Sequence, residues 1–122
     1  MRKKSVEEII KIYIKSAEIT KEALELGNYK KMNREGAKLI KFFKQFEIDK
    51  DYGFMCIDSL LKCDNEIVRI DAASYCFALN YRINDAEKIL EEISENEDVG
   101  IWGLNAEMTL KVWKEQGYLK IY

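Results

Sequence analysis

Apolar residues recur at helical spacing along nearly the whole chain, and this periodicity restricts the fold more than any other feature. No segment alternates apolar and polar residues as a half-buried strand would. The 122 residues include no proline, so nothing in the sequence interrupts a helix. Hydrophobic residues make up 48% of the chain, which is enough for a folded core. The sequence therefore predicts an all-α protein in which residues 1–122 form a single domain.

Turn residues and helix caps divide this pattern into six predicted helices. Ser5 and Glu8 form a capping box at the start of the first helix, and Gly117 is placed to end the last. Gly36 lies inside the second helix, where the close approach of another helix would explain a glycine. The third helix is capped by Asp49 or Asp51, and the fourth by Asp64 or Asn65. The predicted helices cover residues 5–26, 29–46, 52–61, 66–79, 85–95 and 101–116.

A shift of 34 positions places the third and fourth predicted helices on the fifth and sixth. Apolar positions then coincide, as in the pairs Ile67 with Ile101 and Ile70 with Leu104. A period of this length with two helices per unit is typical of α-solenoids, although two similar amphipathic hairpins would give comparable matches. We expect a short HEAT/ARM-like α-solenoid of about three antiparallel helix pairs. The second helix of each pair would line its concave side.

Two segments carry a resemblance to known helical repeats. Residues 64–73, Asp-Asn-Glu-Ile-Val-Arg-Ile-Asp-Ala-Ala, resemble the start of the second helix in a HEAT repeat, where an arginine such as Arg69 bonds to carboxylates or turn carbonyls. The closing run resembles the C-terminal signature of the DUF2019 family, small bacterial proteins with a HEAT-like helical fold, at Ala106, Met108, Thr109, Leu110 and Trp113. The resemblance implies a HEAT-like helical fold for this chain. By analogy it also implies a role like that of immunity proteins, which neutralise toxins in bacterial competition.

Several kinds of catalytic and metal site are excluded by composition. The chain has no histidine, which removes Ser-His-Asp and Cys-His arrangements and the commonest metal ligand. Three cysteines at spacings of 7 and 13 match neither a zinc pattern nor a disulfide framework. We expect Cys56 and Cys76 in the core and Cys63 partly exposed near a helix end. The sequence predicts no enzyme activity, no metal and no cofactor.

Charge is divided unevenly between the two parts of the chain. Residues 1–46 contain 12 Lys/Arg and 6 Asp/Glu, whereas residues 47–122 contain 8 and 16. An acidic concentration over residues 85–98 fits either a surface that attracts a basic partner or an ordinary solvated helix face. Basic side chains of the first two helices fit an alternative partner, nucleic acid, but several have a glutamate at helical spacing, as Lys21 has in Glu18, which favours ordinary surface pairs. The basic side chains are Lys11, Lys15, Lys21, Lys30, Lys31, Arg34, Lys38, Lys41 and Lys44.

Trp102 is the main candidate for a binding anchor, because tryptophan is common in binding hot spots and Trp102 has no apolar stripe of its own. The alternative is that it packs against the preceding turn. With the neighbouring surface positions of the fourth and sixth helices and the acidic run, the candidate partner-binding residues are Asp71, Tyr75, Glu95, Asp98, Trp102 and Asn105.

The predicted function is a non-catalytic protein-binding module, most concretely an immunity-type protein that covers a basic toxin domain. A nucleic-acid-binding helical repeat is the alternative. No apolar run approaches the roughly 20 residues of a membrane span, and the charged opening does not resemble an export signal, so we expect a cytoplasmic protein. The apolar tail, residues 118–122, is expected to fold back on the body.

Overall fold

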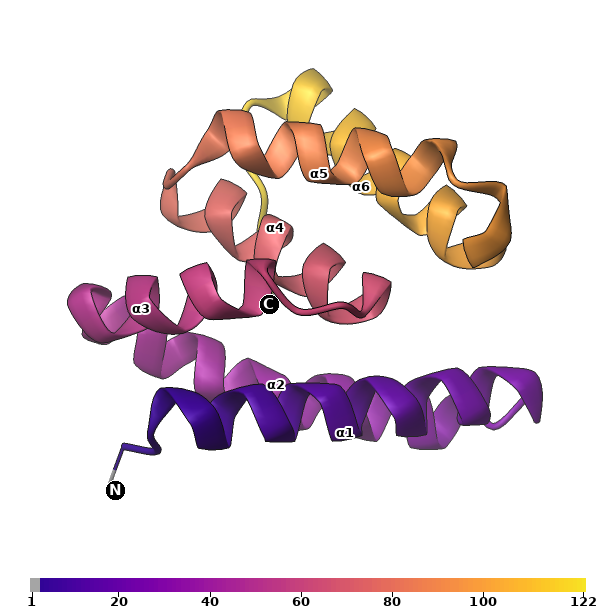
Figure 1. Cartoon of the computed structure of the whole chain (residues 1–122), viewed down its shortest axis with the longest axis horizontal. Coiled ribbons are helices and arrows are strands. Elements are labelled where there is room, and N and C mark those ends of the chain that lie inside the picture. The colour runs from indigo at the N-terminus through magenta and orange to yellow at the C-terminus, as the bar shows by residue number, and fades with distance from the viewer. Residues whose placement is uncertain (1–2) are drawn as a thin grey trace. The chain divides into compact units, whose positions relative to one another are not determined.

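The computed structural model describes residues 3–122, which contain six α-helices, one short 3-10 helix (η1) and no strand (Figure 1). This confirms the all-α prediction. In chain order the elements are α1 (Val6–Glu25), α2 (Tyr29–Ile48), α3 (Lys50–Leu61), α4 (Glu66–Leu79), α5 (Ile83–Glu95), η1 (Glu97–Val99) and α6 (Ile101–Gln116).

Capping side chains account for most of the helix boundaries. The hydroxyl of Ser5 accepts from the N–H of Glu8 at 3.1 Å, and Gly117 ends α6 with a φ of 76°, as predicted. The carboxylate of Asp49 caps α3 by accepting from the backbone N–H of Tyr52, and the helix begins two residues before its predicted start. Asn65 caps α4 by accepting from two backbone N–H groups at 3.0 and 3.1 Å.

The fifth helix also begins two residues earlier than predicted. Arg82 stands before it in the left-handed region, with a φ of 49°, and its guanidinium binds Asp85 at 2.9 Å. Asp85 therefore stabilises the first turn from inside the helix rather than capping it.

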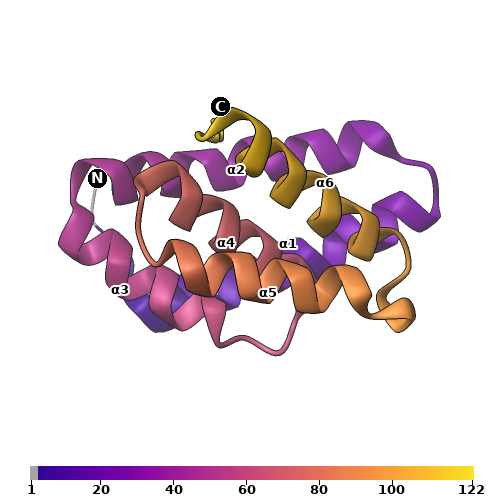
Figure 2. The ribbon, with the colours of Figure 1, turned by 90° about the horizontal axis from the view of Figure 1, so that it is seen from above.

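The chain divides into two compact units, and the first ends at Leu60. In this unit α1 and α2 pack antiparallel (Figures 1 and 2), as expected for helices joined by a short turn. Ile9 and Tyr13 of α1 and Phe43 and Phe46 of α2 are fully buried.

Gly53 determines how closely α3 approaches the end of α2. A Cβ at this position would lie 2.7 Å from both the Cβ and the carbonyl oxygen of Phe46, so only glycine fits. The glycine that sequence analysis singled out, Gly36, is exposed with no atom within 4 Å of such a Cβ. The prediction of close helix packing at Gly36 is therefore wrong, and the close approach occurs at Gly53.

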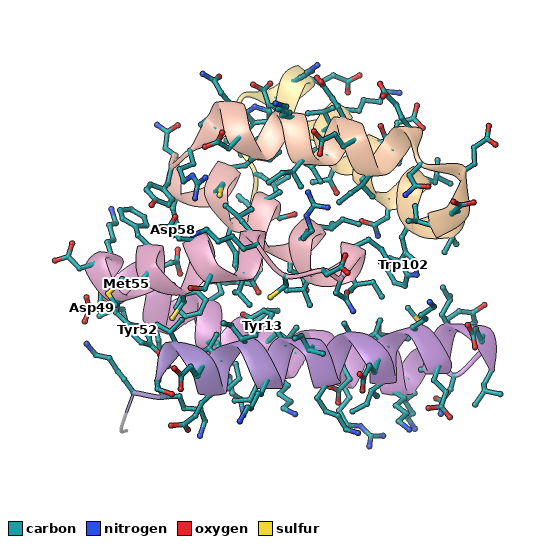
Figure 3. All side chains as sticks on the ribbon, in the orientation of Figure 1. Tyr13, Asp49, Tyr52, Met55, Asp58 and Trp102 are labelled. Atoms are coloured by element: carbon teal, nitrogen blue, oxygen red, sulfur yellow. The ribbon has the colours of Figure 1, made fainter. Side chains whose placement is uncertain are left out.

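The start of the described chain is fastened to the start of α3. The Tyr52 hydroxyl donates to the carbonyl of Lys4 at 2.7 Å, and the ammonium of Lys3 pairs with Asp49 and lies 5.2 Å from the centre of the Tyr52 ring. Figure 3 shows Asp49 and Tyr52 together at this end. The bond from Lys3, followed by the Tyr52 N–H, lowers the pKa of Asp49, whereas desolvation raises the pKa of Tyr52 to about 12. Tyr52 therefore stays a neutral donor.

The second unit begins at Leu61 and contains α4, α5 and α6, each packed antiparallel on the next in sequence. Ala72 and Ala73 of α4 are fully buried, and side chains as small as these let helices approach closely. The predicted bond of Arg69 to a carboxylate is also confirmed, since its guanidinium lies 3.8 Å from Glu92. Cys56 and Cys76 are fully buried and Cys63 is partly exposed, as expected.

Within residues 3–122, no helix is both long and apolar enough to cross a membrane. The tail beyond α6 folds back in part, as predicted, because Leu119 and Ile121 are half-buried while Tyr118 and Tyr122 are exposed.

Candidate functional site

One side of α6 exposes a row of large apolar side chains. Ile101 and Leu104 are 55% and 56% exposed, and Met108 is 50% exposed. Their spacing places them on one face of the helix, while Gly103, Ala106 and Leu110 on the opposite face are buried in the second unit. Scattered apolar residues on a surface need no explanation, but a contiguous row marks a candidate binding surface.

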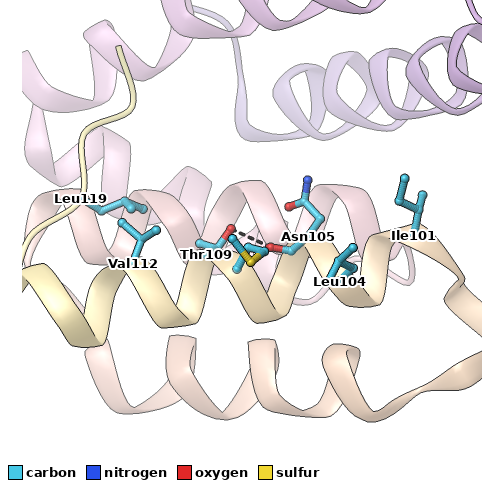
Figure 4. A pocket seen from close by; sticks show the side chains of 7 residues that line it. Ile101, Leu104, Asn105, Thr109, Val112 and Leu119 are labelled. Carbon is cyan, nitrogen blue, oxygen red and sulfur yellow. Dashed lines mark hydrogen bonds between the residues drawn. The ribbon is translucent and has the colours of Figure 1, made fainter.

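These side chains line an apolar groove of about 400 Å³ (Figure 4), here called the α6 groove. Its volume is within the range of small-molecule and peptide sites. The hydroxyl of Thr109 donates to the carbonyl of Asn105 at 2.9 Å, so it is already satisfied by the helix itself. The amide of Asn105 is then the main polar group that a ligand would meet. The groove is lined by Ile101, Leu104, Asn105, Met108, Thr109, Val112 and Leu119.

Close backbone packing holds α6 in place below the groove. A Cβ on Gly103 would lie 3.3 Å from the carbonyl oxygen of Ile93, so α6 approaches the end of α5 closely at this glycine. Further along, the ring of Trp113 stacks on Phe77 at 4.6 Å with an interplanar angle of 2°. Lys114 pairs with Glu91 of α5 at 3.7 Å. Contacts with α4 and α5 therefore hold α6 below the groove near both of its ends.

The repeat offset explains why this face is unusual. The positions equivalent to Ile101 and Leu104 are Ile67 and Ile70 of α4, which are only 7% and 5% exposed. The helices themselves are offset by nearly the same amount, because α5 begins 33 residues after α3 (positions 83 and 50) and α6 begins 35 residues after α4 (positions 101 and 66). A face that is covered in α4 is thus left open in α6.

Two predicted site residues lie on the covered face of α4 rather than on an open surface. Tyr75 is 4% exposed, so the prediction that it lies on an open surface is wrong. Asp71 is partly buried, and desolvation raises its pKa to about 7. Both belong to the covered face of α4, and their equivalents 34 positions later, Asn105 and Thr109, line the α6 groove. Asp71 and Tyr75 thus occupy in α4 the helical face that is exposed in α6.

The acidic residues Glu95, Glu97 and Asp98, here called the acidic segment, precede the groove at its N-terminal end. All three are exposed. The amide of Asn96 holds the turn by accepting from the N–H of Asp98 at 3.0 Å. Nearby Glu91 and Glu92 form ion pairs with Lys114 and Arg69, whereas no ion pair within residues 3–122 involves the acidic segment. Its charge is therefore available to a partner.

The remaining predicted residues are brought together only in part. Asn105 lies in the groove, and Glu95 and Asp98 lie before it. Trp102 follows Ile101 on α6 but is half-buried and is not among the residues that line the groove. Met108, Val112 and Leu119 line the groove but were not among the predicted residues, although Ile101, Leu104, Met108 and Val112 are spaced in the sequence as an apolar stripe on one helical face.

Among residues 3–122, no three carboxylates or thiols gather as a metal-binding cluster. Burial raises the pKa of the Cys56 and Cys63 thiols, which keeps both protonated. Comparison with known protein families, with curated proteins and with solved structures finds no match to the chain.

Proposed function

We propose that the chain is a non-catalytic protein-binding module whose binding surface lies on the second unit. One observation carries the proposal: the apolar face of α6 is open at repeat positions that are covered in α4. Terminal helices of a repeat stack usually present a polar outer face, because an apolar one would be exposed to water. An uncovered apolar face on the last helix is suited to a partner that covers it.

A short HEAT-like solenoid of about three antiparallel pairs, related to the DUF2019 family, is the architecture that we propose for this module. Antiparallel packing inside each unit and the spacing of the helices support it.

The most concrete form of the proposal is a cytoplasmic immunity-type protein that neutralises a basic toxin domain by covering it. Support comes from charge, since residues 61–122 contain 12 Asp/Glu and 7 Lys/Arg. A negative surface speeds encounter with a basic partner and disfavours acidic ones.

The test is to purify the product of the adjacent gene, mix it with the full chain and measure the molar mass of the complex by light scattering. A one-to-one complex that suppresses the toxicity of that product supports the proposal. A chain that forms no complex, and whose deletion leaves cells insensitive to the product, contradicts the immunity role.

A nucleic-acid-binding role is the second candidate, and an exposed basic row on α2 favours it. Lys31, Arg34, Lys38 and Lys41 are all exposed and recur at helical spacing. Titration with a labelled single strand and a labelled duplex at low salt would decide it. Affinity that falls steeply with added salt supports this role, and the absence of binding at low salt eliminates it.

A further inference from the structure

We propose that the α6 groove binds an amphipathic helix of a partner protein, antiparallel to α6, with lysine or arginine in the last turn of that helix. This inference rests on the proposed function and adds the chemistry and orientation of the partner. Helices that dock in apolar grooves do so through residues spaced at i, i+3 or i+4 and i+7.

The dimensions of the groove match one helix. Its lining runs along α6 from Ile101 to Val112, eleven residues apart, which corresponds to about 16 Å at about 1.5 Å per residue. This is the length of about three helical turns. The lining is apolar except for Asn105, whose amide can hydrogen-bond to one polar residue of the partner and so determine its register.

The same dimensions argue against a second copy of the chain as the occupant. A strip about 16 Å long and about 10 Å wide, the diameter of a helix, is much smaller than the roughly 800 Å² that each subunit contributes to a standard stable interface. A docked helical segment needs far less area than a folded subunit, because its apolar stripe alone fills the groove.

Charge gives the partner helix its direction. The acidic segment immediately precedes α6 and so lies beside the helix end that carries Ile101, and none of its carboxylates forms an ion pair within the described part of the chain. A partner helix that runs antiparallel to α6 brings its C-terminal turn to this end. Lysine and arginine are favourable in a last helical turn, and the opposed dipoles of two antiparallel helices attract each other. The antiparallel arrangement also continues the order of α4, α5 and α6.

The probes for the test are labelled helical peptides of about 15 residues, each with leucines at i, i+4, i+7 and i+11. The first peptide carries lysines in its last turn, the second has the same composition with lysines in its first turn, and the third carries glutamates in its last turn. Fluorescence anisotropy against the full chain gives the affinities. We expect the first peptide to bind at least tenfold more tightly than either of the others.

Two exposed methionines provide a matched pair of variants. Met108 lies in the groove and Met55 lies on α3, at 50% and 60% exposure (Figure 3 labels Met55). Met108→Glu should weaken binding of the first peptide at least tenfold, whereas Met55→Glu should leave it unchanged. Leu104→Glu is a second groove variant, and circular dichroism verifies that each variant is folded.

A second pair of variants tests the acidic segment. Glu97→Gln with Asp98→Asn should weaken the first peptide several-fold and remove most of its preference over the glutamate peptide. The control exchanges exposed acids of α1, Glu22→Gln with Glu25→Gln, and should change neither value.

Equal affinity of the three peptides, or binding that survives both groove variants, overturns this inference. A dimer that light scattering detects for the unmodified chain and not for Met108→Glu also overturns it, because the occupant is then a second copy. If the adjacent-gene product binds and Met108→Glu leaves that binding intact, the protein-binding function stands and only the groove assignment fails. If that product does not bind and the first peptide does, the groove assignment stands and the immunity role fails.

Discussion

Replacing Asp71 by asparagine should stabilise the protein at alkaline pH and leave its stability nearly unchanged under acidic conditions. Asp71 is partly buried on α4, and desolvation raises its pKa from 3.8 to about 7. In the unfolded chain the carboxyl group is free in water, with an ordinary pKa near 4. Asparagine has nearly the same shape and carries no charge at any pH.

The direction of this pH dependence follows from the number of protons that the folded and the unfolded states bind. Between about pH 4 and about pH 7 the folded protein keeps a proton on Asp71 that the unfolded chain has lost. The contribution of this group to stability is therefore complete below pH 4 and decreases as the pH rises to 7. Above about pH 7 Asp71 is ionised in both states. The folded state then has to bury a carboxylate, and the free energy of unfolding no longer changes with the titration of this group.

A difference of about three pKa units corresponds to about 4 kcal/mol, at about 1.36 kcal/mol per unit. Part of the Asp71 surface remains in contact with water, which screens the charge, so we expect about 2 kcal/mol. The Asp71→Asn variant should then be more stable than the unmodified protein by about this amount at pH 8, and by about zero at about pH 3.5, below the pKa of the unfolded chain.

Urea unfolding at the two pH values measures the effect. Both tryptophans, Trp102 and Trp113, lie on α6, so their fluorescence follows unfolding of the unit that contains Asp71, while circular dichroism follows all helices. Asp64→Asn is the control, because Asp64 is an exposed acid in the turn before α4. A variant that gains the same stability at both pH values, or none at pH 8, would refute the assignment of a buried acid at Asp71.

Three further substitutions test the packing by urea unfolding. Gly53→Ala should cost about 3 kcal/mol, because its Cβ would lie 2.7 Å from Phe46, and a normal midpoint would show that α3 does not approach α2 this closely. Gly36→Ala should stabilise the protein by about 0.5–1 kcal/mol, since alanine favours an exposed helix and meets no atom there; a loss of stability would indicate hidden packing at this position. Ile67→Ala should cost about 3 kcal/mol and Ile101→Ala less than about 0.5 kcal/mol, and equal costs would mean that the α6 face is covered.

The helices were predictable because their signals are local. Caps such as Ser5 and Asn65 act on the next turn, and Gly117 ends a helix by its own conformation, so the sequence contains what is needed. The starts of α3 and α5 were placed two residues late, because the residues ahead of Asp51 and Asp85 carry no apolar pattern that would extend a helix backwards.

The errors concern contacts between distant residues. Whether a glycine is needed depends on which backbone approaches it, and nothing in the sequence near Gly36 or Gly53 specifies that. Tyr75 was assigned to an open surface because tyrosine, like tryptophan, is common in binding hot spots, yet Tyr75 is only 4% exposed. The repeat offset relates the two helices, since it pairs Tyr75 of α4 with Thr109 of α6. The same helical face therefore occurs once in α4 and once in α6.

The two occurrences of this face differ in a way that bears on function. In α4 the face combines apolar residues with Asp71, whose desolvation is a cost to folding. In α6 the equivalent position is Asn105, an uncharged side chain that can be covered by a partner at a much lower desolvation cost. A nucleic acid would gain little from such a face, because it offers a phosphate no cation and stacks no base on an aromatic ring. A protein helix gains from every part of it, through apolar contact along the groove, one amide for register, and the acidic segment at one end. For this reason the exposed face of α6 favours a protein partner, and we give it more weight than the basic row of α2, which favours a nucleic acid.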